Sequence, residues 1–250
     1  MIKLRTILQK HSGRSGGKVT VRHQGGRNKR FLRTIDFDRR AKANVPGIVK
    51  TIEVDPNRNA HIALVYYADG DKRYIIAPLG LKIGQKINAG DDAALEIGNS
   101  MALSKIAVGT QIHNIEIKPG KGAQAVKSAG SAALVQGREE DWVLVKMPSA
   151  EIKRFSPDSW ATVGQVGNID VRNKVIRKAG TNIRRGIRPT VRGVAQDPHS
   201  HPHGGGEGKS GVGLKYPKTP WGKPAVGNTR SHKKYSDKMI VNGRKRGSHH

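Results

Sequence analysis

Positive charge is concentrated at the two ends of this chain, and this distribution constrains its fold more than any other feature of the sequence. Residues 1–50 carry 14 basic and 2 acidic residues, and residues 171–250 carry 19 basic and 3 acidic residues. Residues 51–170 carry 13 basic and 14 acidic residues, so the middle contributes nothing to the net charge of +27. A surplus of this size repels itself and indicates a polyanionic partner. We therefore expect a neutral folded body between two basic segments that meet a polyanion.

The C-terminal segment, residues 179–250, lacks the means to fold by itself. It is rich in Gly, Pro, Arg, Lys and His and has no sustained apolar periodicity. Such a segment cannot bury enough apolar surface to offset the entropy that is lost when its backbone becomes ordered. It is either a disordered, solubilising tail or an arm that folds against RNA with its cations beside phosphates.

Short β-rich runs with turn signals between them fill the neutral body. Ala60–Tyr67 and Arg73–Ala77 flank Asp69-Gly70, which is a strong hairpin signal. Further strands are expected at Gln85–Ile87, Ala94–Ile97, Thr110–Ile117, Ala132–Gln136, Trp142–Met147 and Glu151–Phe155. Strands this short, without an amphipathic helix of three turns anywhere, predict an all-β fold of small barrels. Because one run of strands ends and another begins around Lys105–Ala107, two β domains fit better than one.

Two details of this body are predicted at the level of single residues. In the strand expected at Thr110–Ile117, alternation places His113, Ile115 and Ile117 on one face. Trp142 and Trp160 are expected in the core, since both lie within the neutral body.

Several classes of function are excluded or disfavoured by composition. The chain contains no Cys, which excludes disulfides, thiolate zinc sites and Cys nucleophiles. No apolar run approaches the roughly 18 residues that span a bilayer. The start of the chain, Met1–Lys10, is too short and too often interrupted by charge for a secretory signal. We therefore expect a soluble, intracellular protein without a membrane partner.

Glycines alternate with cations in Gly16–Arg33 (GGKVTVRHQGGRNKRFLR). Glycine lets the backbone approach a phosphate closely, while Arg and Lys supply charge-assisted hydrogen bonds. The alternative is a solvated basic loop, but the density of cations favours RNA binding. The candidate RNA-binding residues in and beside this segment are Arg14, Lys18, Arg22, His23, Arg27, Lys29, Arg30 and Arg33.

A second motif, Lys118-Pro119-Gly120-Lys121-Gly122, puts two lysines on a tight loop after a strand. It lacks the G-x-x-x-x-G-K-[ST] spacing and no convincing helix follows it, so nucleotide hydrolysis is not expected. Contact with RNA phosphates is the remaining role, and the candidate residues are Lys118, Lys121 and Lys127.

The densest arginine cluster is Arg184–Arg192, with four arginines in nine residues. Guanidinium groups bind phosphates bidentately and stack on bases, and both properties suit folded RNA. A solvated loop is the alternative, but few such loops carry this many arginines without an anionic partner. The candidates in the C-terminal segment are Arg177, Lys178, Arg184, Arg185, Arg188, Arg192, Lys209, Arg230, Lys233 and Lys234.

The most distinctive stretch is His199–Gly208 (HSHPHGGGEG). Its three histidines and Glu207 are compatible with a metal site, because His at i and i+2 of an extended chain can share an ion. They are also compatible with acid–base chemistry, because His titrates near neutral pH. The segment lies in a Gly-rich loop without a rigid scaffold of its own, which favours RNA contact instead. The candidates for that contact are His201, His203, Gly204, Gly205 and Gly206.

Aromatic side chains number only 11, so a stacking platform for single-stranded nucleic acid is not evident. Recognition of folded RNA by shape and phosphate fits the composition better. Trp221, in Lys218-Thr219-Pro220-Trp221-Gly222, lies in the C-terminal segment and is predicted to wedge against RNA.

Specific motifs in this order resemble the bacterial-type large ribosomal subunit protein L-two family. The resemblance is carried by PTVRGVAQDPHSHPHGGGEGKSG (Pro189–Gly211) and TPWGKPAVGNTR (Thr219–Arg230). It extends upstream through Val21–Phe37, Glu53–Leu81, Val108–Gly130 and Ala161–Asn168, and so covers nearly the whole chain.

The resemblance implies an OB-fold barrel followed by an SH3-like barrel, with extended basic N- and C-terminal arms. The corresponding residues are 1–30 for the N-terminal arm, 31–103 for the OB-fold, 104–168 for the SH3-like barrel and 169–250 for the C-terminal arm. It implies a structural, non-enzymatic constituent of the cytoplasmic or an organellar ribosome, placed near the subunit interface and the peptidyl-transferase region. The implied partners are large-subunit rRNA, neighbouring ribosomal proteins and the small subunit, with no cofactor other than Mg²⁺ associated with the rRNA.

Two features depart from the family pattern, and the end of the chain has two interpretations. His201 matches the histidine that has been discussed in the family in relation to peptidyl transfer, but Ser200 stands where the family usually has a carboxylate. A His–Asp pair is therefore not available in this loop. Family members normally also carry a longer N-terminal arm, and the part that would precede Ile2 is absent from this sequence. This indicates either a shortened natural form or an organellar or reduced-genome variant. The closing Gly247–His250 is either native or the remnant of a tag.

Overall fold

The computed structural model describes residues 4–226, 231 and 233–243. The chain divides into two compact units, which we describe separately. The body unit comprises Met1–Leu8, Lys29–Val175 and Lys238–Lys245, and the arm unit comprises Gln9–Asn28, Ile176–Asp237 and Arg246–His250. The predicted RNA contact Arg230 and the closing Gly247–His250 lie outside the described residues. Within the described part of the chain, no helix has the length and apolar character that crossing a membrane requires.

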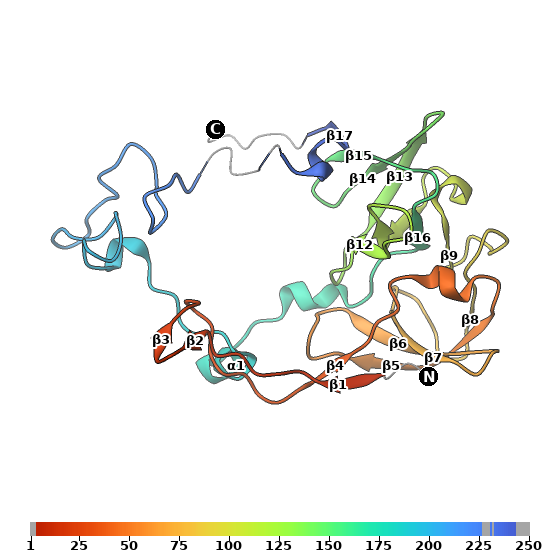
Figure 1. The fold of residues 1–250 in the computed structure, drawn as a ribbon, viewed down its shortest axis with the longest axis horizontal. Helices are drawn as coiled ribbons and strands as arrows, with labels where there is room; N and C mark the ends of the chain where they lie inside the picture. Colours follow the sequence, from red (N-terminus) through yellow and green to blue (C-terminus); the bar gives the residue numbers. More distant parts are fainter. Residues whose placement is uncertain (1–3, 227–230, 232, 244–250) are drawn as a thin grey trace. The chain divides into compact units, whose positions relative to one another are not determined.

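Four antiparallel strands form the first sheet of the body unit, in the order β7–β6–β5–β8 (Figure 1). They are β5 (Gly47–Val54), β6 (His61–Tyr67), β7 (Lys72–Ile76) and β8 (Lys86–Ile87). The predicted hairpin is confirmed, because β6 pairs with β7 and the Tyr67 amide donates to the Asp71 carbonyl oxygen at 2.9 Å. Gly70 has φ +84°, a conformation that most side chains disfavour, and it closes the turn. Side chains from one face of these strands form an apolar core around Val49, Val65 and Ile87.

Seven strands form the second sheet, in the order β17–β15–β14–β13–β10–β16–β9. They are β9 (Ser100–Ala102), β10 (Gln111–His113), β13 (Ala133–Arg138), β14 (Val143–Lys146), β15 (Ile152–Phe155), β16 (Trp160–Val163) and β17 (Ile240–Asn242). Its core includes Ile112, Val135 and Phe155. A third apolar cluster of Ala60, Ile76 and Val166 joins residues from both parts of the body.

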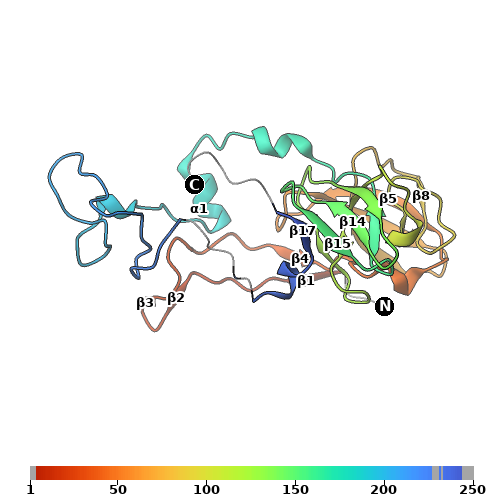
Figure 2. The same cartoon turned by 90° about the horizontal axis from the view of Figure 1, so that it is seen from above.

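The last strand of the second sheet comes from the C-terminal segment. Ile240 pairs with Lys153 of β15, and the Arg154 amide donates to the Met239 carbonyl oxygen at 2.9 Å. Figure 2 shows β14, β15 and β17 side by side. Met239 also packs against the core of this sheet. Part of the segment that was expected to extend as an arm therefore belongs to the body.

The remaining elements are short. Three two-stranded sheets are formed by β1 (Arg5–Ile7) with β4 (Phe31–Arg33), β2 (Arg14–Ser15) with β3 (Lys18–Val19), and β11 (Ile115–Glu116) with β12 (Ala123–Ala125). The helices are η1 (Arg39–Lys42), η2 (Leu103–Lys105), η3 (Ile169–Asn173), α1 (Ala179–Arg185), η4 (Gly193–Ala195) and η5 (Tyr235–Asp237).

The prediction of an all-β fold is confirmed, since α1, the one α-helix among the described residues, spans only seven of them. The two larger sheets follow one another in the order expected for an OB-fold and an SH3-like barrel. Closure of each sheet into a barrel stays a prediction, as do the domain boundaries. β9 lies before the boundary that was placed at residue 103, and it pairs with β16 in the second sheet.

Three local predictions for the body were wrong. Ala94–Ile97 is not a strand, because the Ala94 carbonyl oxygen accepts local hydrogen bonds from the Glu96 amide and the Asn99 side chain. The strand expected at Thr110–Ile117 is divided by Asn114, whose φ of +51° ends β10 and begins β11.

The third error concerns Trp142, which is 37% exposed. The Arg154 guanidinium lies over its ring, 5.1 Å from the centroid, which is an arrangement suited to the surface. Trp160 is half-buried, and the Arg40 guanidinium lies 5.4 Å from the centroid of its ring. Both tryptophans therefore pack against cations, and neither is fully enclosed in the core.

Candidate nucleic-acid interface

Main-chain hydrogen bonds join the two basic segments of the arm unit. The Gly25 amide donates to the Gly186 carbonyl oxygen at 2.8 Å, and the Arg188 amide donates to the His23 carbonyl oxygen at 3.0 Å. Residues 23–28 therefore run antiparallel to residues 184–188, and we call these two segments the basic junction. Its first segment follows the β2–β3 hairpin, and its second comprises the end of α1 and the residues after it (Figure 1).

Glycine is required in the basic junction for close approach of two backbones. Gly186 has φ +91° and ends α1, and a Cβ atom there would lie 3.0 Å from the Gly25 carbonyl oxygen. A Cβ atom on Gly25 would lie 2.9 Å from Cδ of Arg188. Gly25, one of the glycines that suggested access for phosphates, and Gly186 thus have an intramolecular role, which is to bring two cation-bearing segments together.

The junction presents a group of cations at the surface. Arg184, Arg185 and Arg188 are exposed, and Arg184 and Arg185 occupy the last turn of α1. Arg27 is half-buried and its Nη2 atom donates to the Gln9 carbonyl oxygen at 2.5 Å. The structure therefore brings predicted RNA contacts from both ends of the sequence into one place.

Trp221 stands on an exposed turn of the arm unit and is itself 77% exposed. The Gly222 amide donates to the Thr219 carbonyl oxygen at 2.9 Å, which closes the turn around the tryptophan. The Arg22 guanidinium lies over the indole ring, 5.5 Å from its centroid. Exposed tryptophan with a cation over it is suited to stacking on an RNA base.

The two inner histidines of the His199–Gly208 loop both accept hydrogen bonds from the main chain. The His203 amide donates to Nδ1 of His201 at 3.0 Å, and the Lys218 amide donates to Nε2 of His203 at 2.8 Å. The two rings meet edge to face, with centroids 4.6 Å apart. Their ring nitrogens therefore fix the loop and connect it to the turn that carries Trp221.

Glycines around this loop allow close packing. A Cβ atom on Gly193 would lie 2.5 Å from Cε1 of His201, so the imidazole ring rests against bare backbone. A Cβ atom on Gly204 would lie 2.4 Å from the Asp197 carbonyl oxygen, and one on Gly205 would lie 2.9 Å from Cγ of Pro198. The glycine triplet was read as room for RNA, and in the structure all three glycines pack against the loop itself, Gly206 against Ser210.

The environment of His201 favours the neutral imidazole. Burial is the main cause that lowers its pKa, and the neighbouring His203 and Arg22 add to the effect. His201 is 8% exposed. Over the described residues, no group of three or more His, Asp or Glu side chains is arranged to hold a metal ion. In the described loop His201 therefore serves as the acceptor of a main-chain hydrogen bond.

The Lys118–Gly122 loop of the body is held in place by a buried carboxylate. Glu116, which is 1% exposed, accepts from the Gly122 amide at 3.0 Å and pairs with Arg40 at 2.9 Å. This arrangement holds the β11–β12 turn and leaves Lys118 and Lys121 at the surface.

Lys127 faces inward instead. Its ammonium lies 4.4 Å from the centroid of the Phe37 ring and donates to the Ala123 carbonyl oxygen at 3.3 Å. Burial, together with the charge of Arg58, lowers its pKa.

Two arginines that were predicted to bind RNA are engaged by the body. Arg30 donates to the Pro56 carbonyl oxygen at 2.9 Å, and Arg33 lies 3.8 Å from the buried carboxylate of Asp55. The other predicted cations lie at the surface without being drawn into one cluster: Arg14, Lys18, Lys29, Arg177, Lys178, Arg192, Lys209, Lys233 and Lys234. Lys215 and Lys223, on either side of Trp221, were not predicted as contacts, and their charge is the one signal that could have identified them.

Electrostatics sets the arm unit apart from the body. Within residues 9–28 and 176–237, 18 basic residues face only 3 acidic residues, Asp197, Glu207 and Asp237. The ion pairs of Glu53, Asp55, Asp71 and Glu116 all lie in the body. The arm unit therefore carries a large excess of positive charge, which is typical of a surface that binds a polyanion.

Comparison with known families points in the same direction. One family model, described as Ribosomal Proteins L2, RNA binding N-terminal domain, matches residues 1–89. A second, described as Ribosomal Proteins L2, C-terminal domain, matches residues 96–222. Because both matches are to the same family and together span most of the sequence, the chain belongs to the L2 family of ribosomal proteins and is an rRNA-binding constituent of the large ribosomal subunit.

Proposed function

We propose that this chain is an architectural protein of the cytoplasmic large subunit, without catalytic activity of its own. The arm unit lies in folded rRNA near the peptidyl-transferase region, and the assembled protein supports association with the small subunit. Neighbouring ribosomal proteins complete its surroundings. In this proposal Mg²⁺ belongs to the rRNA, and the protein carries no cofactor.

The observation that carries this proposal is the basic junction. Two segments that are more than 150 positions apart in the sequence are joined by main-chain hydrogen bonds between Gly25 and Gly186 and between His23 and Arg188. Cations that are brought together repel one another. Binding to a folded polyanion offsets this repulsion, because counterions are released when the phosphates are neutralised. A surface that gathers arginine on a fixed backbone is therefore suited to phosphate binding.

The His199–Gly208 loop supports an architectural role over a catalytic one. The Nδ1 atom of His201 and the Nε2 atom of His203 are occupied as acceptors for main-chain amides. Ser200 cannot stabilise an imidazolium as a carboxylate would. The loop is thus organised to hold a shape against RNA.

Salt dependence of rRNA binding tests the proposal. If about six to ten phosphates are neutralised, the affinity of the full chain for a large-subunit rRNA fragment should drop some thousandfold or more between about 50 and 200 mM salt. Replacing Arg184, Arg185 and Arg188 with Gln should reduce the slope of log affinity against log salt by about one for each phosphate contact that is lost.

The control is a variant with the same loss of charge in the body, in which the exposed Lys82, Lys105 and Lys146 are replaced by Gln. For this control, the slope of log affinity against log salt should be closer to that of the original chain than the slope of the triple-arginine variant is. A nearly flat salt response of the original chain, or equal effects of the two triple variants, would contradict the proposed role of the basic junction.

A further inference from the structure

The outer face of the first sheet is covered at one end only. Tyr74 of β7 is 1% exposed there, and its hydroxyl group contacts Glu53 at 3.1 Å and Arg5 of β1 at 2.9 Å. Ile35 forms a bridge to Tyr74, and the Asp36 amide donates to the Tyr74 carbonyl oxygen at 2.7 Å. The Arg5 side chain of β1 thus covers this end of the face, while residues 35 and 36 pair with the edge of β7.

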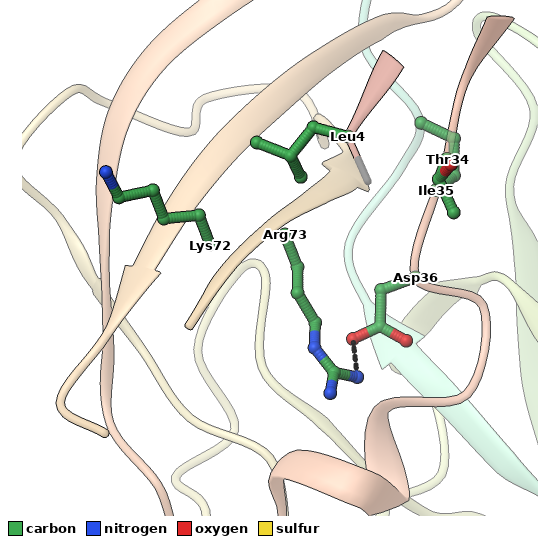
Figure 3. Close-up of a pocket in the computed structure, with 6 residues that line it drawn as sticks. All are labelled: Leu4, Thr34, Ile35, Asp36, Lys72 and Arg73. Carbon is green, nitrogen blue, oxygen red and sulfur yellow. Dashed lines mark hydrogen bonds and ion pairs between the residues drawn. The ribbon is translucent and has the colours of Figure 1, made fainter. Parts of the chain in front are cut away.

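A pocket of about 100 Å³ marks where the cover stops (Figure 3). Leu4, Thr34 and Ile35 line it on one side, and Lys72 and Arg73 line it from β7. Inside the pocket Asp36 and Arg73 are paired at 3.1 Å, although burial raises the pKa of the Asp36 carboxyl against the effect of Arg73. Figure 3 shows the Lys72 side chain pointing away from this ion pair. The charge of Lys72 is therefore directed toward the uncovered end of the face.

Strand register places four exposed side chains in one row at that uncovered end. Ile48 of β5 pairs with Lys86 of β8 on one side and with Tyr66 of β6 on the other, and Tyr66 pairs with Lys72 of β7. Residues directly opposite one another in antiparallel strands point to the same face. Ile48 is 48% exposed and Tyr66 is 38% exposed. We call Lys86, Ile48, Tyr66 and Lys72 the open row.

The open row has an apolar centre and a cation at each end. The Lys72 ammonium lies over the Tyr66 ring, 4.7 Å from its centroid. The acidic residues of the adjoining turn do not cancel this charge, because Asp69 and Asp71 are paired with the buried side chain of Lys42. An aromatic ring between two ammonium groups matches a nucleotide, whose base stacks on the ring and whose flanking phosphates attract the cations.

A protein partner fits this row less well. The centres of protein interfaces are depleted in charged residues, and lysine in particular is disfavoured there. The open row carries a lysine at each end within a four-residue span, and the exposed Lys50 follows Ile48 along β5. RNA is the occupant that uses both the ring and the charges.

We propose that the open row is a binding site for an unpaired nucleotide of rRNA, with the base on Tyr66 and Ile48 and the adjacent phosphates on Lys72 and Lys86. The proposal rests on the rRNA binding of the whole chain and adds a second contact surface, which lies in the body and is independent of the basic junction. On binding, the base replaces the Lys72 ammonium over the ring, and the ammonium moves to a phosphate. A cation–π contact at an exposed site is weak enough for this exchange.

The test compares substitutions at Tyr66 in the full chain, with deproteinised large-subunit rRNA as the probe. Tyr66→Ala should lower the affinity about fivefold or more at fixed salt, because base–aromatic stacking is lost, and should leave the salt slope unchanged. Tyr66→Phe keeps the ring and should stay within about twofold of the original chain. Lys72→Gln should instead reduce the salt slope by about one.

Trp142→Ala is the matched control, because Trp142, which immediately precedes β14, is a similarly exposed aromatic residue with a cation over its ring. It should change the affinity by less than about twofold. Thermal unfolding verifies that each variant is folded, and the Lys72→Gln slope gives an independent result if Tyr66→Ala is unstable. Equal losses for Tyr66→Ala and Trp142→Ala, or a Lys72→Gln slope equal to that of the original chain, would overturn the proposal.

Two further outcomes are distinguishable. If Tyr66→Ala binds deproteinised rRNA normally but enters reconstituted large subunits poorly, the row is occupied by a protein and the proposal is wrong. If the original chain itself does not bind rRNA, the proposed function is wrong, and the proposed nucleotide site in the open row is wrong as well.

Discussion

His201 is a side chain of a type that often serves in catalysis, but here it has a structural role. Its ring lies against the bare backbone of Gly193, and its Nδ1 atom accepts a hydrogen bond from the His203 amide at 3.0 Å. Burial lowers its pKa, with His203 and Arg22 as smaller causes, so protonation is disfavoured. A residue that is held neutral, with Nδ1 occupied, has little capacity for proton transfer through that atom.

Substituting His201→Gln should therefore leave catalysis by assembled ribosomes nearly intact. Gln keeps a polar group of similar reach but does not titrate near neutral pH. Peptide-bond formation should remain within about tenfold of the original rate, with an unchanged pH profile, after correction for assembly yield. A catalytic base contributes about a hundred- to ten-thousandfold, so a loss beyond about a thousandfold in intact particles would contradict the architectural role.

His113 is fully buried in the body, and its stability effect has a defined sign. Burial lowers its pKa from 6.5 to about 4, even though the Gly164 carbonyl oxygen lies 2.8 Å from Nδ1. Because the unfolded chain binds the proton more readily, this contribution to stability is complete above about pH 6.5 and is lost as the pH falls toward about 4.

Urea unfolding of the full chain as a function of pH would measure this effect. Between pH 7 and pH 4 the free energy of unfolding should decrease by about 3 kcal/mol more for the original chain than for His113→Gln. Comparing the two chains removes the contribution that the carboxylates share. Parallel pH profiles for the two proteins would show that His113 is not held neutral by burial.

At the level of elements, the basic junction depends on the end of α1. Gly186 ends the helix with φ +91°, and its amide donates to the carbonyl oxygens of Asn182 and Ile183. The same residue then accepts a hydrogen bond from the Gly25 amide. One glycine thus both stops the helix and brings the N-terminal segment against it.

Gly186→Ala should disturb the junction, because the new Cβ atom would lie 3.0 Å from the Gly25 carbonyl oxygen in a strained conformation. We expect rRNA affinity to decrease by about tenfold, whereas the thermal unfolding of the body should be unchanged. Gly180→Ala is the matched control within α1, because a Cβ atom there meets nothing within 4 Å. It should be neutral or slightly stabilising through helix propensity. Equal losses of affinity in both variants would argue against the junction.

At the scale of the whole molecule, the body and the arm unit differ in what stabilises them, because the apolar residues lie mainly in the body. The cores around Val49, Ile112 and Ile76 are built almost entirely from residues between 35 and 166. In the arm unit, order comes from main-chain hydrogen bonds, glycine contacts and the two histidines. Body and arm unit are therefore stabilised by different means, and they should respond differently to removal from the chain.

A fragment spanning residues 31–168 should fold cooperatively, because it contains nearly all of the three cores. A fragment of residues 179–250 should be disordered by itself, because it lacks residues 23–28, whose main chain pairs with residues 184–188. NMR spectra of the two fragments would check this. Dispersed amide signals from the free C-terminal fragment would show that the arm unit does not need its N-terminal part.

Sequence patterns predicted those elements whose signals are local. The Asp69-Gly70 hairpin and the strands around Val135, Val145 and Arg154 are confirmed, since turn residues and β-branched runs act over a few positions. The division at Asn114 was missed, because alternation of apolar residues does not reveal a residue with positive φ. Ile48 and Tyr66 were not recognised as neighbours, because their pairing depends on the register of two strands.

The sequence by itself determined the class of fold, the polyanionic partner and the family, because composition, charge distribution and contiguous motifs carry that information. Only the tertiary structure decided which cations come together. Arg30 and Arg33 share a basic segment with Arg27, yet they contact Pro56 and Asp55 of the body. The physical reason is that a charged side chain acts through its neighbours in space. Those neighbours are set by hydrogen bonds and packing between segments that are distant in the sequence.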